Sequence, residues 1–151
     1  MRYIILFYLF AGIVAHSQYW QQEIDYKIEV NFDNINNQYK GFQKIKYTNN
    51  SPETLRKVFF HLYFNAFKPG SEIALRQDNS ADKNTRFKVD IDSLDAKQQG
   101  FLKVFNLYQN GKLLETVNSE TILEVVLDTP LLPSETTEFS MEFMGQVPDL
   151  V

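Results

Sequence analysis

The sequence contains no cysteine, and its six glycines are scattered along 151 residues. Without cysteine, neither a disulfide bond nor a cysteine-ligated metal centre can form within the chain. Without a glycine cluster, a phosphate-binding loop of the glycine-rich type is excluded. A hydrophobic core alone must therefore hold the folded chain together.

Histidine and clustered positive charge are also scarce. The two histidines are His16 and His61, and neither an H-E-x-x-H nor a G-x-S-x-G motif occurs. Hydrolytic zinc needs about three protein ligands, so this chain cannot assemble such a site, and a serine triad lacks its motif too. The formal net charge is −4 and no basic patch is visible, which argues against a nucleic-acid partner.

Two side chains that could take part in catalysis have simpler structural interpretations. His61 stands between Phe60 and Leu62 in an expected strand, so we expect a packed histidine rather than a metal ligand or a base. Ser51 precedes Pro52 in an expected turn, where a capping role is favoured over that of a nucleophile. We therefore predict no catalytic, cofactor-binding or metal-binding residue in this chain.

Residues 78–84 are the one candidate for an ion site. Oxygen-bearing side chains alternate there, as they do in some calcium loops: Asp78, Ser80, Asp82 and Asn84. However, Lys83 stands where such loops have glycine, and no glutamate occupies the closing position. A solvated loop is the favoured interpretation, and calcium binding is the alternative.

The N-terminus reads as a secretory signal covering residues 1–17. Arg2 precedes an apolar run over 3–14, and a cleavage-like sequence follows at 15–17. The run is shorter than the roughly 20 residues that cross a bilayer, which favours a cleaved signal over a membrane anchor. We expect an exported chain, periplasmic or extracellular, that comprises residues 18–151 and does not contact the membrane after cleavage.

Large aromatic side chains are abundant, with 13 Phe and eight Tyr. Such a composition argues for a packed, β-rich body. Period-two alternation over 26–32 and 39–47 predicts two strands with one wet face each, joined by a turn at 33–37 into a hairpin. The sequence at 49–52 breaks the second strand. It fits a glycosylation signal formally, but Pro52 makes that signal weak.

The rest of the chain continues the β pattern with one interruption. Residues 58–64 are apolar on both faces, which predicts an interior strand covered on both sides. A turn at 68–71 and a short helix at 72–77 are expected next. Four further strands are predicted, at 87–92, 101–108, 123–127 and 139–143. Asn110-Gly111 predicts a tight hairpin, and the sequence at 130–134 predicts a stop after the third of these strands.

These patterns together predict an all-β fold. The expected architecture is a twisted antiparallel sheet or a β-sandwich, with one short helix or irregular excursion around 66–86. The last residues, 145–151, follow a strand directly, and we expect the domain over 18–151 to be incomplete at this end.

Two runs in the sequence resemble the N-terminal domain of M1-family zinc aminopeptidases, above all the secreted members of Bacteroidetes-type bacteria. Residues 41–52 read GFQKIKYTNNSP, and residues 61–71 read HLYFNAFKPGS. The start at 19–22, the hairpin at 110–111 and the closing strand at 136–147 agree with this resemblance. It covers essentially all of residues 18–151.

The resemblance implies a saddle-shaped β domain that packs on a thermolysin-like catalytic domain and covers one side of its substrate cleft. In this family the G-x-M-E-N segment, the H-E-x-x-H…E zinc site and the transition-state tyrosine all lie downstream of that domain. None of these motifs occurs here, so no catalytic role transfers to a residue of this chain. Zinc, peptide substrates and the catalytic partner domain would belong to a longer parent, and this chain alone is predicted to be inactive.

Two other classes of protein stay open at this stage. The main alternative is a free-standing secreted β-sandwich that binds a protein or a glycan. A small enzyme with an unrecognised site is the third class, and the sequence offers it little support.

Overall fold

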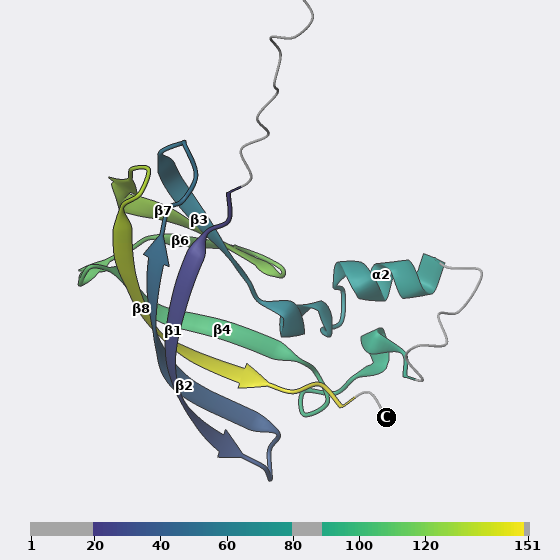
Figure 1. The fold of residues 1–151 in the computed structure, drawn as a ribbon. Coiled ribbons are helices and arrows are strands. Elements are labelled where there is room, and N and C mark those ends of the chain that lie inside the picture. The colour runs from purple at the N-terminus through teal and green to yellow at the C-terminus, as the bar shows by residue number, and fades with distance from the viewer. Residues whose placement is uncertain (1–19, 80–88, 150–151) are drawn as a thin grey trace, which may run out of the picture.

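Two antiparallel sheets and a helical excursion make up the fold (Figure 1). The computed structural model describes residues 20–79 and 89–149. The helical elements of this part are η1 (Tyr63–Ala66), α2 (Glu72–Asn79) and η2 (Ile91–Ser93). Its strands are β1 (Glu23–Asp33), β2 (Gln38–Thr48), β3 (Leu55–His61), β4 (Phe101–Gln109), β5 (Lys112–Leu113), β6 (Thr116–Ser119), β7 (Ile122–Leu131) and β8 (Thr136–Gln146). The predicted all-β class with one short helix is confirmed.

The larger sheet has the strand order β1-β2-β8-β4-β5. The predicted β1–β2 hairpin is confirmed, with Tyr26 opposite Ile45. Its turn forms because the Asp33 carboxylate accepts hydrogen bonds from the backbone N–H groups of Ile35 and Asn36, at 3.0 and 3.1 Å. The Asn110-Gly111 turn is also present, and both residues adopt positive φ, 49° and 84°, as a tight hairpin turn requires.

The smaller sheet has the order β3-β7-β6 and corrects one prediction. We expected β3 to lie in the interior, covered on both sides. It is instead an edge strand, and Phe59 on its outer face is 58% exposed while Val58 on its inner face is buried. Apolar residues on both faces of this run therefore do not mean that both faces are covered.

Strand β7 extends further than its sequence suggests. We expected a stop from Pro130 onward, but β7 continues to Leu131. The pairing of β7 with β3 is irregular between Leu55 and Lys57, so the missing N–H of Pro130 falls in a stretch without a regular ladder. There the Gln109 side chain bonds both backbone groups of Thr129, at 2.9 and 3.2 Å.

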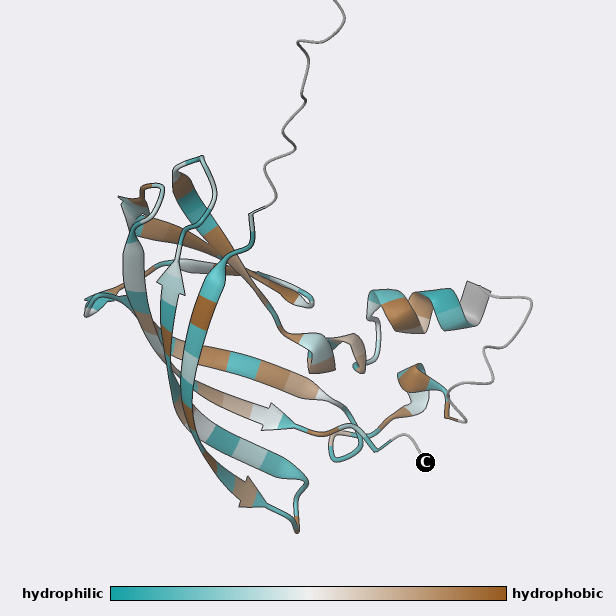
Figure 2. Cartoon of the chain, in the orientation of Figure 1, coloured by the Kyte–Doolittle hydropathy of each residue, from teal (hydrophilic) through white to brown (hydrophobic). Residues whose placement is uncertain are grey.

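The main core lies between the two sheets. Phe139 of β8 is 1% exposed and meets Phe60 of β3 edge to face, with ring centroids 6.1 Å apart. Figure 2 shows apolar residues interspersed with polar ones along the strands of both sheets. The buried members of this core are Ile45, Val58, Leu62, Leu107, Leu114, Leu123, Val125, Leu127, Leu131, Phe139 and Met141.

The excursion after β3 carries a small core of its own, in which Ala74, Ile91 and Leu94 are buried. The predicted turn and short helix are confirmed, since α2 begins at Glu72. The strand predicted over 87–92 is wrong for its described part, because residues 91–93 form the 3-10 turn η2. The Asp90 carboxylate accepts the N–H of Asp92 at 3.0 Å and so starts this turn instead of a strand.

No helix within residues 20–79 and 89–149 is long and apolar enough to cross a membrane.

Candidate functional site

The described residues contain no cluster of ligands for a metal. Among residues 20–79 and 89–149, no three His, Asp or Glu side chains are grouped so that they could hold an ion. Ser80, Asp82 and Asn84 of the acidic loop lie outside the described residues, as does the side chain of Asp78. The calcium hypothesis for residues 78–84 therefore stays a prediction.

Asn49 and Ser51 form a buried network that joins several chain segments. Asn49 is 0% exposed, and its amide donates to the carbonyl oxygens of Glu53 and Leu131, at 2.7 and 3.1 Å. Its side-chain oxygen accepts the Ser51 N–H at 3.0 Å and the Ser51 hydroxyl at 2.7 Å. The Ser51 hydroxyl also accepts the Glu53 N–H at 3.4 Å, which agrees with the capping role expected for this residue. Because the Asn49 amide is buried and bonded, the weak glycosylation signal at this residue describes an inaccessible side chain.

His61 is not the packed histidine that the sequence predicts. Its side chain is exposed, and its ring stacks on the Tyr63 ring with centroids 5.1 Å apart and planes within 5°. Strand β3 ends at His61, and the 3-10 turn η1 starts at Tyr63. This change of backbone brings the two rings parallel. Leu62 between them is 2% exposed and anchors the turn in the core.

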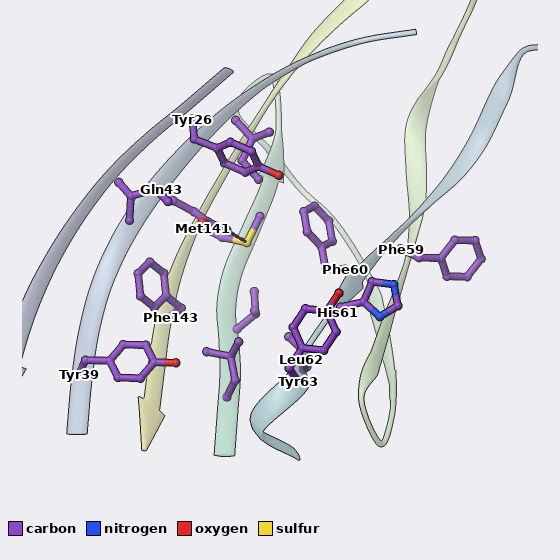
Figure 3. A pocket seen from close by; sticks show the side chains of 14 residues that line it. Tyr26, Tyr39, Gln43, Phe59, Phe60, His61, Leu62, Tyr63, Met141 and Phe143 are labelled. Carbon is purple, nitrogen blue, oxygen red and sulfur yellow. Dashed lines mark hydrogen bonds between the residues drawn. The ribbon is translucent and has the colours of Figure 1, made fainter. Parts of the chain in front are cut away.

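A groove opens beside this stacked pair and is the candidate functional site. Its volume is about 470 Å³, and both edge strands β1 and β3 contribute to its walls. Figure 3 shows Tyr26 and Tyr39 projecting from the larger sheet toward the side where Phe60, His61 and Tyr63 lie. The remaining lining residues are Ile28, Gln43, Ile45, Phe59, Leu62, Leu102, Val104, Met141 and Phe143.

Two glycines shape the groove floor. A Cβ at Gly145 would lie 2.3 Å from Cζ of Tyr39, and a Cβ at Gly41 would lie 2.7 Å from Cζ of Phe143. In the strand register Tyr39 faces Gly145 and Gly41 faces Phe143. Each aromatic ring therefore lies over the glycine opposite it, an arrangement that fills the space which the missing side chain leaves in a sheet.

The groove lining is mostly apolar and aromatic, and its polar groups include the His61 ring, the Gln43 amide and the tyrosine hydroxyls. The side-chain amide of Gln43 donates a hydrogen bond to Sδ of Met141 at 3.0 Å, so this polar group already has a partner inside the groove. Burial raises the pKa of the Tyr39 hydroxyl above its ordinary value, which keeps that group protonated at neutral pH. The arrangement can contact large apolar or aromatic side chains and donate hydrogen bonds from tyrosine hydroxyls.

Sequence reasoning missed the feature that makes this groove open. The alternation over 26–32 predicts a strand with one covered face, yet its apolar residues are exposed by 37% at Val30 to 78% at Phe32. Tyr63 was likewise expected within an apolar strand, and it is 68% exposed. Period two reports that residues share a face, but it carries no signal for whether that face is covered.

Comparison with solved structures places this architecture among known folds. The M1 zinc metallopeptidase from Deinococcus radiodurans, and mutants of such an enzyme bound to a Tyr-Ser-Ala substrate or to L-tryptophan, each match with a TM-score of 0.50 at 16% sequence identity. The match covers 82% of this chain and 20% of theirs, so the chain spans about a fifth of their length. No protein-family model and no curated protein matches the sequence. The chain therefore has the fold of one part of an M1 zinc metallopeptidase.

Proposed function

We propose that this chain is a non-catalytic β domain of an exported M1-like zinc metallopeptidase, an aminopeptidase. The observation that carries the proposal is the fold match, which covers most of this chain and a fifth of the matched enzymes. The residue runs at 41–52 and 61–71 point to the N-terminal domain of that family, in its secreted Bacteroidetes-type form. In this role the domain packs on the catalytic domain of the parent and borders its substrate cleft.

The described residues fit a supporting role. Asn65, in the second of those runs, is 4% exposed and joins three segments. Its amide donates to the Glu120 carbonyl at 2.9 Å, and its oxygen accepts the Leu102 N–H at 2.9 Å. Ser51 and Asn49, in the first run, serve the network described above. The residues that carry the resemblance thus maintain the scaffold, and zinc would be held elsewhere in the parent.

Antibody depletion from the producing cells tests the proposal. An antibody raised against the purified chain should remove aminopeptidase activity and zinc together from the exported fraction. Antibody that has first been saturated with the purified chain is the matched control and should remove neither. Depletion of the chain with all aminopeptidase activity left behind would contradict the proposal.

The open groove favours a second candidate, a secreted module that binds a protein or a glycan. Exposed tyrosine and histidine rings beside a cavity of about 470 Å³ are suited to such binding. The same depletion experiment separates the two candidates. A module would be removed without zinc and without loss of aminopeptidase activity.

A further inference from the structure

We propose that the free edge of β1 docks an extended polypeptide segment in which large apolar side chains alternate with basic ones. The segment would add a strand to the larger sheet and place its apolar side chains over the groove. This inference does not depend on the proposed function, because it concerns which chemistry the edge recognises.

The backbone of β1 is available for pairing along one side. Within the described residues β1 is the terminal strand of its sheet, and it pairs over its whole length, Glu23 to Asp33, with β2 alone. An edge strand presents unpaired N–H and C=O groups, to which an extended segment can add by main-chain hydrogen bonds. At 11 residues β1 also exceeds the seven of β3, the other edge at the groove.

One face of β1 is apolar and uncovered. Its exposed fractions are 39% at Ile24, 59% at Tyr26, 50% at Ile28, 37% at Val30 and 78% at Phe32. Tyr26 and Ile28 line the groove directly. A strand added at this edge would set its own side chains beside this row, where cross-strand apolar pairs stabilise a sheet.

The opposite face of the sheet carries mostly acidic charges on β8, basic charges on β2 and mostly acidic charges on β1, with Lys27 of β1 opposite Lys44 of β2 as the exception. Strand β8 contributes acidic residues there, including Glu138, and β2 contributes Lys46 and Lys44. Lys44 and Glu138 lie 3.5 Å apart, and Lys46 is opposite Asp25 of β1. The ionisable residues of β1 on this face are Glu23, Asp25, Lys27, Glu29 and Asp33.

The acidic excess on β1 decides which occupant fits. Lys27, the one cation of the set, already lies 3.7 Å from Glu29. A strand placed next to β1 continues the alternation when it carries lysine or arginine on this face. A second copy that paired its own β1 here antiparallel over the full length would set Glu23 opposite Asp33 at both ends and would offer Lys27 as its one cation, so it complements the acidic excess less well than a segment with a basic residue at every second position.

Peptide binding to the purified 151-residue chain tests the proposal. The probe is an 11-residue peptide that alternates isoleucine with lysine, matched in length to β1. A peptide that alternates isoleucine with glutamate is its control. We expect the lysine peptide to bind at least about tenfold more tightly, with an affinity that falls as salt is added. Two versions of the lysine peptide, N-methylated on the odd-numbered or on the even-numbered residues, distinguish edge pairing. The version whose methyl groups replace the N–H groups that face β1 should not bind.

A charge reversal on β1 sharpens the test. The variant Asp25→Lys/Glu29→Lys changes two exposed side chains and should reverse the preference, so that the glutamate peptide binds more tightly. The matched control is Glu115→Lys/Glu120→Lys, which alters the net charge equally beside β6. This control should keep the preference for lysine.

Three outcomes would overturn the proposal. The first is that the unmethylated lysine peptide and both of its N-methylated versions bind equally well, because no edge pairing would then occur. The second is that the control variant at Glu115 and Glu120 reverses the preference between the two peptides as much as the variant at Asp25 and Glu29 does, because the preference would then follow net charge alone. The third is a stable dimer of the chain that the lysine peptide does not dissociate, since a second copy would then occupy the edge.

Discussion

At the residue scale, Asn49 is the side chain that links the turn after β2 to the end of β7. Asn49→Asp keeps the shape but replaces an amide that donates to two buried carbonyl oxygens. We expect a loss of about 3 kcal/mol in the free energy of unfolding at pH 7, because a buried charge then faces those oxygens. Chemical denaturation measures the loss. The neighbouring exposed variant Asn50→Asp should cost less than about 1 kcal/mol.

The same variant has a pH dependence of defined sign. Burial raises the folded-state pKa of the introduced carboxyl above its unfolded value. Its protonated form is therefore favoured on folding, and the deficit shrinks below the unfolded pKa and grows as pH rises through the folded one. A deficit that is larger at pH 4 than at pH 7 would contradict the buried, donating role of Asn49.

Gly41 and Gly145 separate a backbone constraint from a side-chain constraint. A Cβ at Gly145 meets the Tyr39 ring, whereas a Cβ at Gly41 also meets the backbone oxygen of Glu29 at 2.2 Å. Each alanine variant should cost about 1–3 kcal/mol. Removing the ring with Tyr39→Ala should make Gly145→Ala cheaper by about 1 kcal/mol or more, and Phe143→Ala should not rescue Gly41→Ala equally.

Double-mutant cycles of unfolding measure both couplings. Equal rescue at the two glycines would show that flexible rings, and not the β1 backbone, limit the space at Gly41.

Asp33 reports on the β1–β2 turn through its titration. The Asn36 side-chain amide first, and then the Asn36 N–H, hold the pKa of the Asp33 carboxyl below its ordinary value. The stabilisation is thus present above the unfolded-state pKa and is lost as pH falls through the lower folded-state pKa. Asn36→Ala should raise the pKa part of the way back, since the backbone bonds remain. A carboxyl NMR titration measures this, and an unchanged pKa would remove the amide as its cause.

At the element scale, alternation and turn chemistry predicted most of the larger sheet. The strands 26–32 and 39–47, the Asn110-Gly111 turn and the closing strand were all expected from local sequence. The local sequence did not predict which strands have exposed faces. Strands β1 and β2 show the same alternation, although only β2 has a neighbouring strand on each side. The groove, which depends on the uncovered faces of β1 and β3, could not be predicted for that reason.

Two further elements depended on signals that local patterns do not contain. The residues of η2 alternate like a strand, yet Ile91 is 0% exposed because it packs in the small core with α2. Strand β7 passes through Pro130 because the distant side chain of Gln109 satisfies the backbone there. Both cases are tertiary effects that override the local pattern.

Ile28 and Ile45 test the difference between an open and a covered strand face. Both isoleucines lie in the β1–β2 hairpin, but Ile28 is 50% exposed and Ile45 is 3% exposed. Ile45→Ala should cost about 2–5 kcal/mol through the cavity it leaves, whereas Ile28→Ala should cost less than about 1 kcal/mol. Urea denaturation of the purified chain measures both. Similar losses at the two positions would mean that the β1 face is covered in solution.

At the scale of the whole molecule, two sheets share one core and leave the groove open between their edge strands β1 and β3. An apolar face of this kind is typical of a surface that another polypeptide covers. The proposed role as a domain of a larger enzyme would account for the open groove and for the scaffold roles of Asn49 and Asn65, and it agrees with the fold shared with M1 zinc metallopeptidases.

The intact mass of the native exported product tests this account most directly. Purified through an antibody to the chain, the product should begin at Gln18, be several times heavier than residues 18–151 alone, and contain zinc. A stable product that consists of residues 18–151 and contains no zinc would contradict the account. That result would leave a free-standing binding module as the working protein.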